Sequence, residues 1–174
     1  MNVRRRQKSI EARKQEHAEV TDPTLVLEAA LRFLEARQRS TVEVRTRLNR
    51  AGYRPDLVEG AITRLIELGM LDDAAFAKAW VESRDRARPR GERALRSELR
   101  TKGIDRAVVD ETMADREADR PDADDEAARR LLERHASALA RIADPRARRQ
   151  RAYALLARNG FDPDVAASAS RTIE

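Results

Sequence analysis

Residues 48–57 read LNRAGYRPDL, and the same pattern returns as LRTKGIDRAV at residues 99–108 and as LARNGFDPDV at residues 156–165. In each copy a leucine stands four residues before a glycine, an apolar residue follows the glycine directly, and an aliphatic residue follows five positions after it. This spacing is typical of a helix that ends at a left-handed glycine and turns into a second helix. The three glycines, to which we assign a structural role, are Gly52, Gly103 and Gly160.

A further helix precedes each of these pairs, because apolar residues recur at helical spacing upstream of every motif. The six prolines stand where helical periods begin, and Gly69 joins the motif glycines at helix ends. We therefore expect nine helices in an all-α fold, with three tandem three-helix repeats in an elongated, curved array. The expected segments are a basic N-terminal arm, mobile or a frayed helix, at residues 1–22, and repeats at residues 23–70, 71–118 and 119–174, the last beginning with an acidic linker.

Aspartates stand at the expected beginnings of several helices. Asp105 and Asp162 follow the second and third motif glycines, and Asp72 precedes a helix that begins near Asp73, where each can accept hydrogen bonds as an N-cap. This gives the acidic pair at 72 and 73 a structural role in place of a metal site. Phe76 and Trp80, which lie on one apolar stripe, are also assigned to folding. Gly60 lies inside a helical period, where we expect it to permit the close approach of another helix.

The composition limits the classes of function. Charged residues make up 39% of the chain and the formal net charge is +5, which favours nucleic acid, or a complex that contains it, as a partner. The absence of cysteine excludes disulfide scaffolds and cysteine zinc sites, and no long apolar run predicts a membrane segment. We therefore expect a cytoplasmic protein. We also expect it to act as a monomer.

Catalytic groups are scarce. His17 falls in the N-terminal arm, and His135 falls on the apolar stripe of the expected seventh helix, where a packed or boundary histidine is expected. The acidic residues at 122–126 lack the glycine and spacing of a calcium loop, so we interpret them as a solvated linker and a charged helix N-terminus. No phosphate loop, paired-histidine motif or nucleophile elbow occurs. The sequence thus predicts no enzyme, no cofactor and no metal.

The charges alternate along the chain. Nine basic and four acidic residues occur from Arg84 to Arg106, nine acidic residues and two arginines from Asp110 to Glu126, and basic residues dominate again from Arg141 to Arg158. Alternating patches of this kind can fix the register of a charged partner. From charge and expected exposure we select as partner-binding residues Arg39, Arg45, Arg84, Arg88, Arg90, Arg93, Arg96 and Lys102.

These residues together resemble the RecX family of RecA regulators. The first repeat resembles it through Arg37, Arg39, Ser40, Glu43, Leu48, Gly52 and Tyr53. The resemblance continues through Gly69, Leu71, Asp72, Asp73, Phe76, Ala77, Trp80, Val81 and Arg84, and then through Arg90, Gly91, Leu95, Glu98, Leu99, Lys102, Gly103 and Ile104. The third repeat is similar only through Leu155, Leu156, Gly160 and Phe161, and the basic arm does not belong to the shared pattern.

The resemblance implies a non-enzymatic regulator, mainly an inhibitor, that binds the RecA filament on single-stranded DNA. Such a protein limits filament growth or stability and lowers strand exchange, ATP turnover and LexA cleavage in DNA repair and the SOS response. Weak direct contact with DNA is left open. Two alternatives also remain: a stand-alone helical DNA-binding regulator, and a metal-dependent nuclease that uses Asp124 and Asp125.

Overall fold

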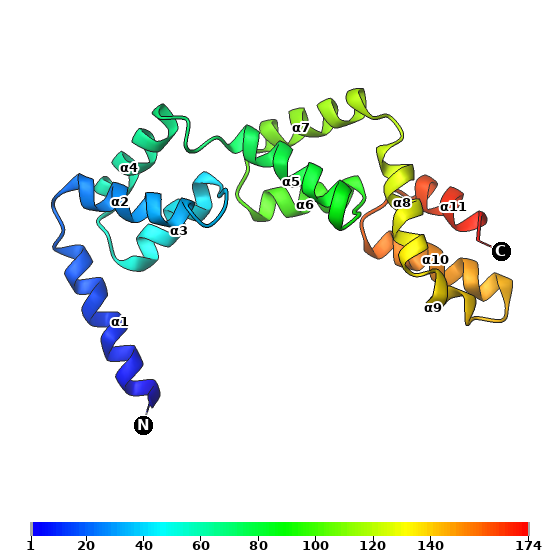
Figure 1. Ribbon diagram of the computed structural model, residues 1–174, viewed down its shortest axis with the longest axis horizontal. Helices are drawn as coiled ribbons and strands as arrows, with labels where there is room; N and C mark the ends of the chain where they lie inside the picture. The colour runs from blue at the N-terminus through cyan, green and yellow to red at the C-terminus, as the bar shows by residue number, and fades with distance from the viewer. Residues whose placement is uncertain (1, 174) are drawn as a thin grey trace. The chain divides into compact units, whose positions relative to one another are not determined.

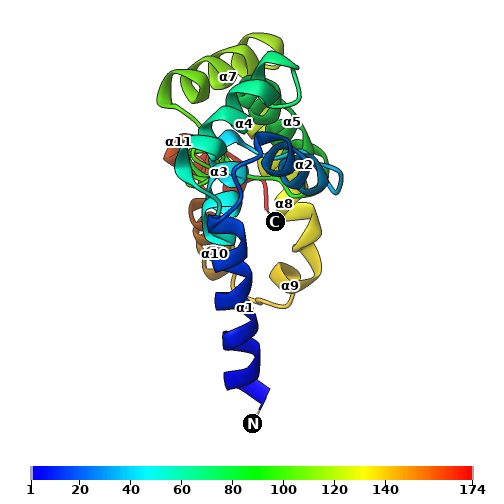
Figure 2. The same ribbon diagram turned by 90° about the vertical axis from the view of Figure 1, so that its left-hand side faces the viewer.

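The computed structural model describes the backbone of residues 2–173 and the side chains of residues 10–173. Within these residues all regular structure is helical, which confirms the predicted fold class (Figure 1 and Figure 2). The helices are α1 (Asn2–Ala18), α2 (Pro23–Leu34), α3 (Thr41–Ala51), α4 (Pro55–Glu67), α5 (Asp73–Ala87), α6 (Glu92–Thr101), α7 (Arg106–Asp119), α8 (Ala123–Arg134), α9 (Ala136–Ala140), α10 (Pro145–Arg158) and α11 (Pro163–Arg171).

Three three-helix repeats are visible in this order, as predicted. They consist of α2–α4, α5–α7, and α8, α10 and α11, with α9 as an extra short helix between α8 and α10. The expectation that one helix carries the apolar stripe as far as Leu139 is wrong. Helix α8 ends at Arg134, and exposed His135 forms the junction with α9, its Nδ1 atom lying 2.9 Å from the carbonyl oxygen of Leu131.

Local sequence sets the beginnings of the helices. Four of the six prolines occupy the first helical position, where a missing N–H leaves no hydrogen bond unmade. The predicted caps at Asp105 and Asp162 are confirmed, since each side chain accepts a hydrogen bond from the backbone N–H two residues later. Asp72 accepts from the N–H groups of Ala74 and Ala75, at 2.9 Å each, and so caps α5 as predicted.

The glycine turns have the predicted geometry. Positive φ angles of 102°, 67°, 78° and 83° occur at Gly52, Gly69, Gly103 and Gly160, respectively. In the first motif the N–H of Tyr53 donates to the carbonyl oxygen of Leu48, which closes the helix in the hydrogen-bond pattern expected after a left-handed residue. The apolar residue after the glycine is thereby directed back toward the last turn of the helix.

Two compact units divide the chain. The first contains residues 1–76 and 102–104, and the second contains residues 77–101 and 105–174. The first unit therefore includes the glycine turn of the second repeat. The elongated, curved arrangement and the limits of the repeats stay predictions.

The apolar core of the first unit is built from aliphatic side chains on α2, α3 and α4, with Leu71 beyond them. In the second unit a separate core joins α8, α10 and α11 around Phe161, which is 2% exposed. Each burial of a leucine or valine stabilises the fold by about 1.5–3 kcal/mol, so each unit relies on many small contributions. This agrees with a chain that is only 3% aromatic.

Helix α1 occupies most of the predicted N-terminal arm and contacts the first repeat. The ring of His17 stacks on Tyr53 with centroids 4.3 Å apart, and its Nδ1 atom lies 2.7 Å from the carbonyl oxygen of Ala51. A Cβ atom on Gly52 would lie 2.6 Å from the carbonyl oxygen of Lys14. The C-terminal end of α1 is thus packed on the turn that follows α3. The side chains of the basic residues 1–9 lie outside the described part of the structure.

The prediction for Gly60 is wrong. It lies in the middle of α4, and a Cβ atom placed on it would find no other atom within 4 Å, apart from the helix's own backbone. No helix approaches at this position, so close packing does not require glycine here.

Candidate partner-binding surface

Most of the eight cations selected from the sequence form ion pairs within the protein. Only Arg88 and Arg93 are well exposed, whereas the other six are half-buried. Carboxylates of the same chain bind six of the eight, namely Arg45, Arg84, Arg90, Arg93, Arg96 and Lys102. The charge excess that was predicted for a partner is therefore partly neutralised within the protein.

In the first unit Lys102 belongs to a junction built around Ser40. The Ser40 hydroxyl accepts from the N–H of Glu43 at 3.2 Å and donates to the carbonyl oxygen of Lys102 at 2.6 Å. The Lys102 ammonium in turn donates to the Glu43 carboxylate at 2.7 Å. One capping box thereby both begins α3 and holds the 102–104 turn.

The charges of this junction change the acidity of Glu43. Partial burial alone would raise its pKa, but the Lys102 hydrogen bond, the Ser40 N–H and the positive charges of Lys102 and Arg37 together lower the pKa below 4.5. Glu43 is therefore ionised at neutral pH, and the Lys102 ion pair is formed.

A second group surrounds Glu98 on α6. Trp80 donates its indole N–H to the Glu98 carboxylate at 2.8 Å, and Arg84 donates to the same oxygen at 2.6 Å. The Arg84 guanidinium also lies 4.2 Å from the centre of the Trp80 ring. Arg90 lies 3.6 Å from Glu98 and hydrogen-bonds Asn159 of the third repeat. Trp80 and Arg84, which the sequence assigned to different roles, thus act together in the packing of α5 on α6.

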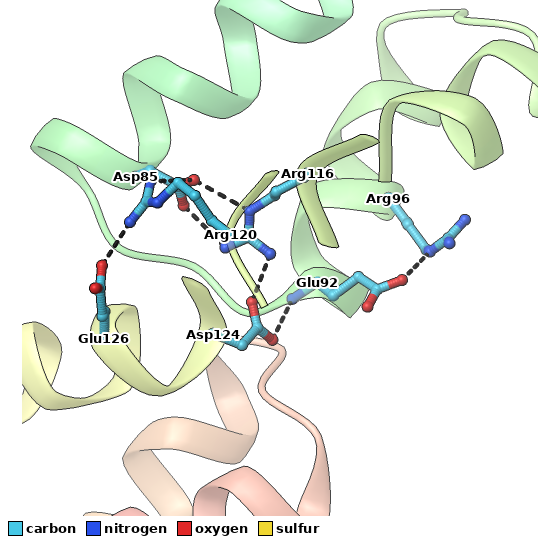
Figure 3. A network of polar contacts seen from close by, with 7 residues as sticks. All are labelled: Asp85, Glu92, Arg96, Arg116, Arg120, Asp124 and Glu126. Carbon is cyan, nitrogen blue, oxygen red and sulfur yellow. Dashed lines mark hydrogen bonds and ion pairs between the residues drawn. The ribbon is translucent and has the colours of Figure 1, made fainter. Parts of the chain in front are cut away.

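A buried ion-pair network connects α5, α7 and α8 in the second unit (Figure 3). Arg116 binds Asp85 through two hydrogen bonds, of 3.0 and 3.1 Å, and binds Asp124 at 2.8 Å. Asp124 also accepts from the backbone N–H of Glu92 at 3.0 Å, while Arg120 joins Asp85 to Glu126. Burial alone would lower the pKa of Arg116, but the two carboxylates outweigh it and raise the pKa.

The network corrects the interpretation of the acidic residues at 122–126. They do form the charged N-terminus of α8, but Asp124 is half-buried and ion-paired, not solvated. Both carboxylate oxygens of Asp124 already accept hydrogen bonds, from Arg116 and from the backbone N–H of Glu92, so neither is left for a cation without breaking these bonds. In the part of the chain that the structure describes, no group of three or more histidine or acidic side chains is placed to hold a metal ion.

Arg39 and Arg88 differ from the other selected cations. Neither has a carboxylate partner among the side chains described. Arg39 lies with its guanidinium 4.2 Å from the centre of the Phe33 ring, and Arg47 lies 5.8 Å from the same ring. We call Phe33, Arg39 and Arg47 the Phe33 cluster. An aromatic ring with two cations is a suitable contact for an anionic or planar partner group.

An exposed apolar segment was not predicted from the sequence. Ile66, Leu68 and Met70, at the end of α4 and in the loop beyond it, are each about half exposed. They make up three of the seven large exposed hydrophobic residues within residues 10–173. Apolar side chains that gather on a surface commonly mark a contact with another protein. In the sequence these three apolar residues stand at every second position from 66 to 70, and this spacing does not fit the apolar stripe of a helix.

The described helices include none that is long and apolar enough to span a bilayer.

Models of the RecX family match the chain three times. The first three-helix domain of RecX matches residues 27–65, the second matches residues 72–113, and the third matches residues 122–169. The matches follow one another in the order of the family's own domains and together include most of the chain.

Curated relatives carry the name regulatory protein RecX. That of Chlorobium phaeobacteroides is 32% identical over 146 residues, which is 82% of this chain and 89% of the relative. That of Streptomyces coelicolor is 34% identical over 136 residues, which is 78% of this chain and 70% of the relative. A Mycobacterium relative (strain JLS) is 42% identical over 88 residues, so the match spans about half the length of each of the two chains (51% and 48%).

Two solved structures share the fold. The crystal structure of RecX from Lactobacillus salivarius superimposes with a TM-score of 0.75 at 20% identity, over 87% of this chain and 96% of that one. A second crystal structure, of a regulatory protein RecX, gives a TM-score of 0.75 at 21% identity and covers 86% and 73% of the two chains. With three ordered domain matches and a relative similar over nearly its whole length, this chain belongs to the RecX family.

Proposed function

We propose that this protein regulates RecA by binding, as a monomer in the cytoplasm, the filament that RecA forms on single-stranded DNA. The observation that carries the proposal is membership of the RecX family through all three domains. Binding limits filament growth or stability, and thereby lowers strand exchange, ATP turnover and LexA cleavage. The protein acts through contacts and breaks no bond itself.

Two surfaces of the first unit suit a partner that contains both protein and a polyanion. The exposed Ile66, Leu68 and Met70 suit an apolar patch on a RecA protomer. The Phe33 cluster suits an acidic side chain or a phosphate. Several weak contacts on one chain gain strength when they bind neighbouring protomers, because the second contact forms at a high effective concentration.

Among the eight selected cations, we propose Arg39 and Arg88 as the strongest contributors. Arg45, Arg96 and Lys102 each have a carboxylate partner within 2.7 Å, so a contact with RecA or DNA would first have to break that ion pair. Arg88 has no such competing interaction among the described side chains. Effects on filaments require only that the protein binds one filament state more tightly than another.

The test adds the protein to RecA on single-stranded DNA and follows ATP hydrolysis and filament length together. We expect both to fall with increasing protein. A fall at substoichiometric ratios supports capping of growing ends, whereas a fall near stoichiometric ratios supports binding along the filament. Unchanged filaments and unchanged ATP consumption at every ratio would contradict the proposal.

The apolar surface has its own test in the variant Leu68→Asp/Met70→Asp. Loss of a central apolar contact weakens a protein interface by about 2 kcal/mol or more, so binding to RecA filaments should fall about thirtyfold or more. The matched control is Leu25→Asp, because Leu25 is exposed to a similar degree in the same unit but lies on α2. Equal losses in both variants would remove the apolar segment from the proposed interface.

A further inference from the structure

Helix α10 carries the largest group of arginines without carboxylate partners in the described chain. Arg141 precedes the helix and is followed by four exposed arginines on it, Arg146, Arg149, Arg151 and Arg158. None of the five forms an ion pair with any side chain between residues 10 and 173. This differs from the preceding repeat, where carboxylates bind most of the arginines that sequence analysis selected.

The one acidic residue in this segment, Asp144, is outnumbered by the five arginines. Asp144 caps α10, and its two carboxylate oxygens accept from the backbone N–H groups of Arg146 and Ala147, at 3.2 and 3.0 Å. The Asp144 carboxylate therefore offsets the positive end of the helix dipole, and the exposed arginines still exceed it in charge. A field of one sign, open to solvent, attracts a polyanion.

An aromatic ring lies on the same face of the helix. Arg146, Arg149 and Tyr153 follow each other at spacings of three and four residues, so their side chains share one side of α10. Tyr153 is 38% exposed and does not belong to the core of this unit, whereas its neighbours Ala152 and Leu156 are buried in that core. The hydrophobic core therefore does not account for the position of Tyr153, and its ring is accessible to a partner.

We propose that this face of α10 is a binding site for single-stranded nucleic acid. Arg146 and Arg149 bind phosphates, and Tyr153 stacks on the face of a base. That face is accessible only when the base is not stacked within a duplex. An acidic protein would satisfy the arginines but would leave the ring without a role. The site deepens the proposed function and rests on it for its biological setting, because a RecA filament contains single-stranded DNA.

The experiment leaves RecA out, so that failure of this site and failure of the proposed function are distinguishable. Fluorescence anisotropy measures binding of the full chain to labelled oligothymidylate and to a labelled duplex over a series of salt concentrations. The variants are Arg146→Ala/Arg149→Ala, Tyr153→Ala and Tyr153→Phe. The control is Arg54→Ala/Arg64→Ala, which removes the same charge from exposed arginines that are ion-paired on and before α4.

The expected results separate the two kinds of contact. Loss of two phosphate contacts should weaken binding to both probes and reduce the salt slope for oligothymidylate by about 1.4, at about 0.7 per phosphate. Tyr153→Ala should weaken binding to oligothymidylate about five- to hundredfold without changing the slope, should leave duplex binding unchanged, and should be rescued by Tyr153→Phe.

Three results would overturn the proposal. In the first, the Arg146→Ala/Arg149→Ala variant binds like the unmodified protein. In the second, the Arg54→Ala/Arg64→Ala control loses as much affinity, so that net charge alone explains binding. In the third, the protein captures polyglutamate through these arginines but does not bind oligothymidylate, which would assign the face to an acidic protein.

Discussion

At the residue scale, Gly103 combines two requirements at one position. Its φ angle of 78° is one that side chains with a Cβ rarely adopt, and a Cβ atom there would lie 2.5 Å from the Cβ of Val42. Gly60 has neither requirement, because it is helical, exposed and unopposed. The same substitution should therefore have opposite effects at the two positions.

Gly103→Ala is expected to destabilise the protein by about 1 kcal/mol or more, because the left-handed backbone and the contact with Val42 both oppose a methyl group. Gly60→Ala is expected to stabilise it by about 0.5–1 kcal/mol, because alanine restricts the unfolded chain and favours the helix. Urea unfolding followed by circular dichroism measures both. A larger loss for Gly60→Ala than for Gly103→Ala would show that the packing around these glycines is misassigned.

Lys102→Ala should raise the pKa of Glu43. The substitution removes the hydrogen bond and charge that lower this pKa, but leaves the burial that raises it. Because the folded-state pKa is lowered, Glu43 stabilises the first unit above pH 4.5, and this contribution is lost as the pH falls through the folded-state pKa. A carboxyl titration by NMR measures the shift, and an unchanged Glu43 titration in the variant would exclude the ion pair.

At the element scale, helix boundaries were predictable and charge partners were not. Prolines, aspartate caps and left-handed glycines act within a few residues, so the sequence alone places them correctly. Arg116 and Asp85, by contrast, are 31 positions apart and meet only when α5 and α7 pack. The basic and acidic segments that appeared to alternate along the surface instead neutralise one another in part, as Arg96 does with Asp110.

The network around Arg116 is expected to hold the elements of the second unit together. Arg116 and Asp85 have side chains that are 8% and 5% exposed, so Arg116→Ala would leave the Asp85 carboxylate buried with only the more distant Arg120 as a partner. Removal of one partner of a buried ion pair costs about 3–5 kcal/mol, and we expect a loss of that order in urea unfolding.

The matched control for this prediction is Arg106→Ala. Arg106 lies on the same helix as Arg116 and is paired with Asp110 at 3.6 Å, but its side chain is 91% exposed. Its replacement should leave the unfolding midpoint unchanged, because exposed ion pairs are screened by solvent. Similar midpoints for the Arg116 and Arg106 variants would mean that the buried network does not contribute to stability.

At the scale of the whole molecule, the repeated module explains how a chain with little aromatic content folds, because each of the two units has an aliphatic core of its own. The sequence predicted the module, but it could select the partner-binding residues only by charge and expected exposure. The structure directs the search for contacts to arginines without carboxylate partners among the described side chains, in the Phe33 cluster and on α10, and to the apolar segment at Ile66, Leu68 and Met70. Which side chains remain free depends on the folded chain and could not be deduced from composition.

We propose that the protein binds the RecA filament in preference to the components of the filament. The most direct test measures the affinity of the full chain for RecA filaments on single-stranded DNA, for free RecA and for the same DNA without RecA, in one buffer. We predict that the filament is bound most tightly, because only the filament presents neighbouring protomers and DNA together. Equal affinity for naked DNA and for the filament, or no binding to the filament, would contradict the account.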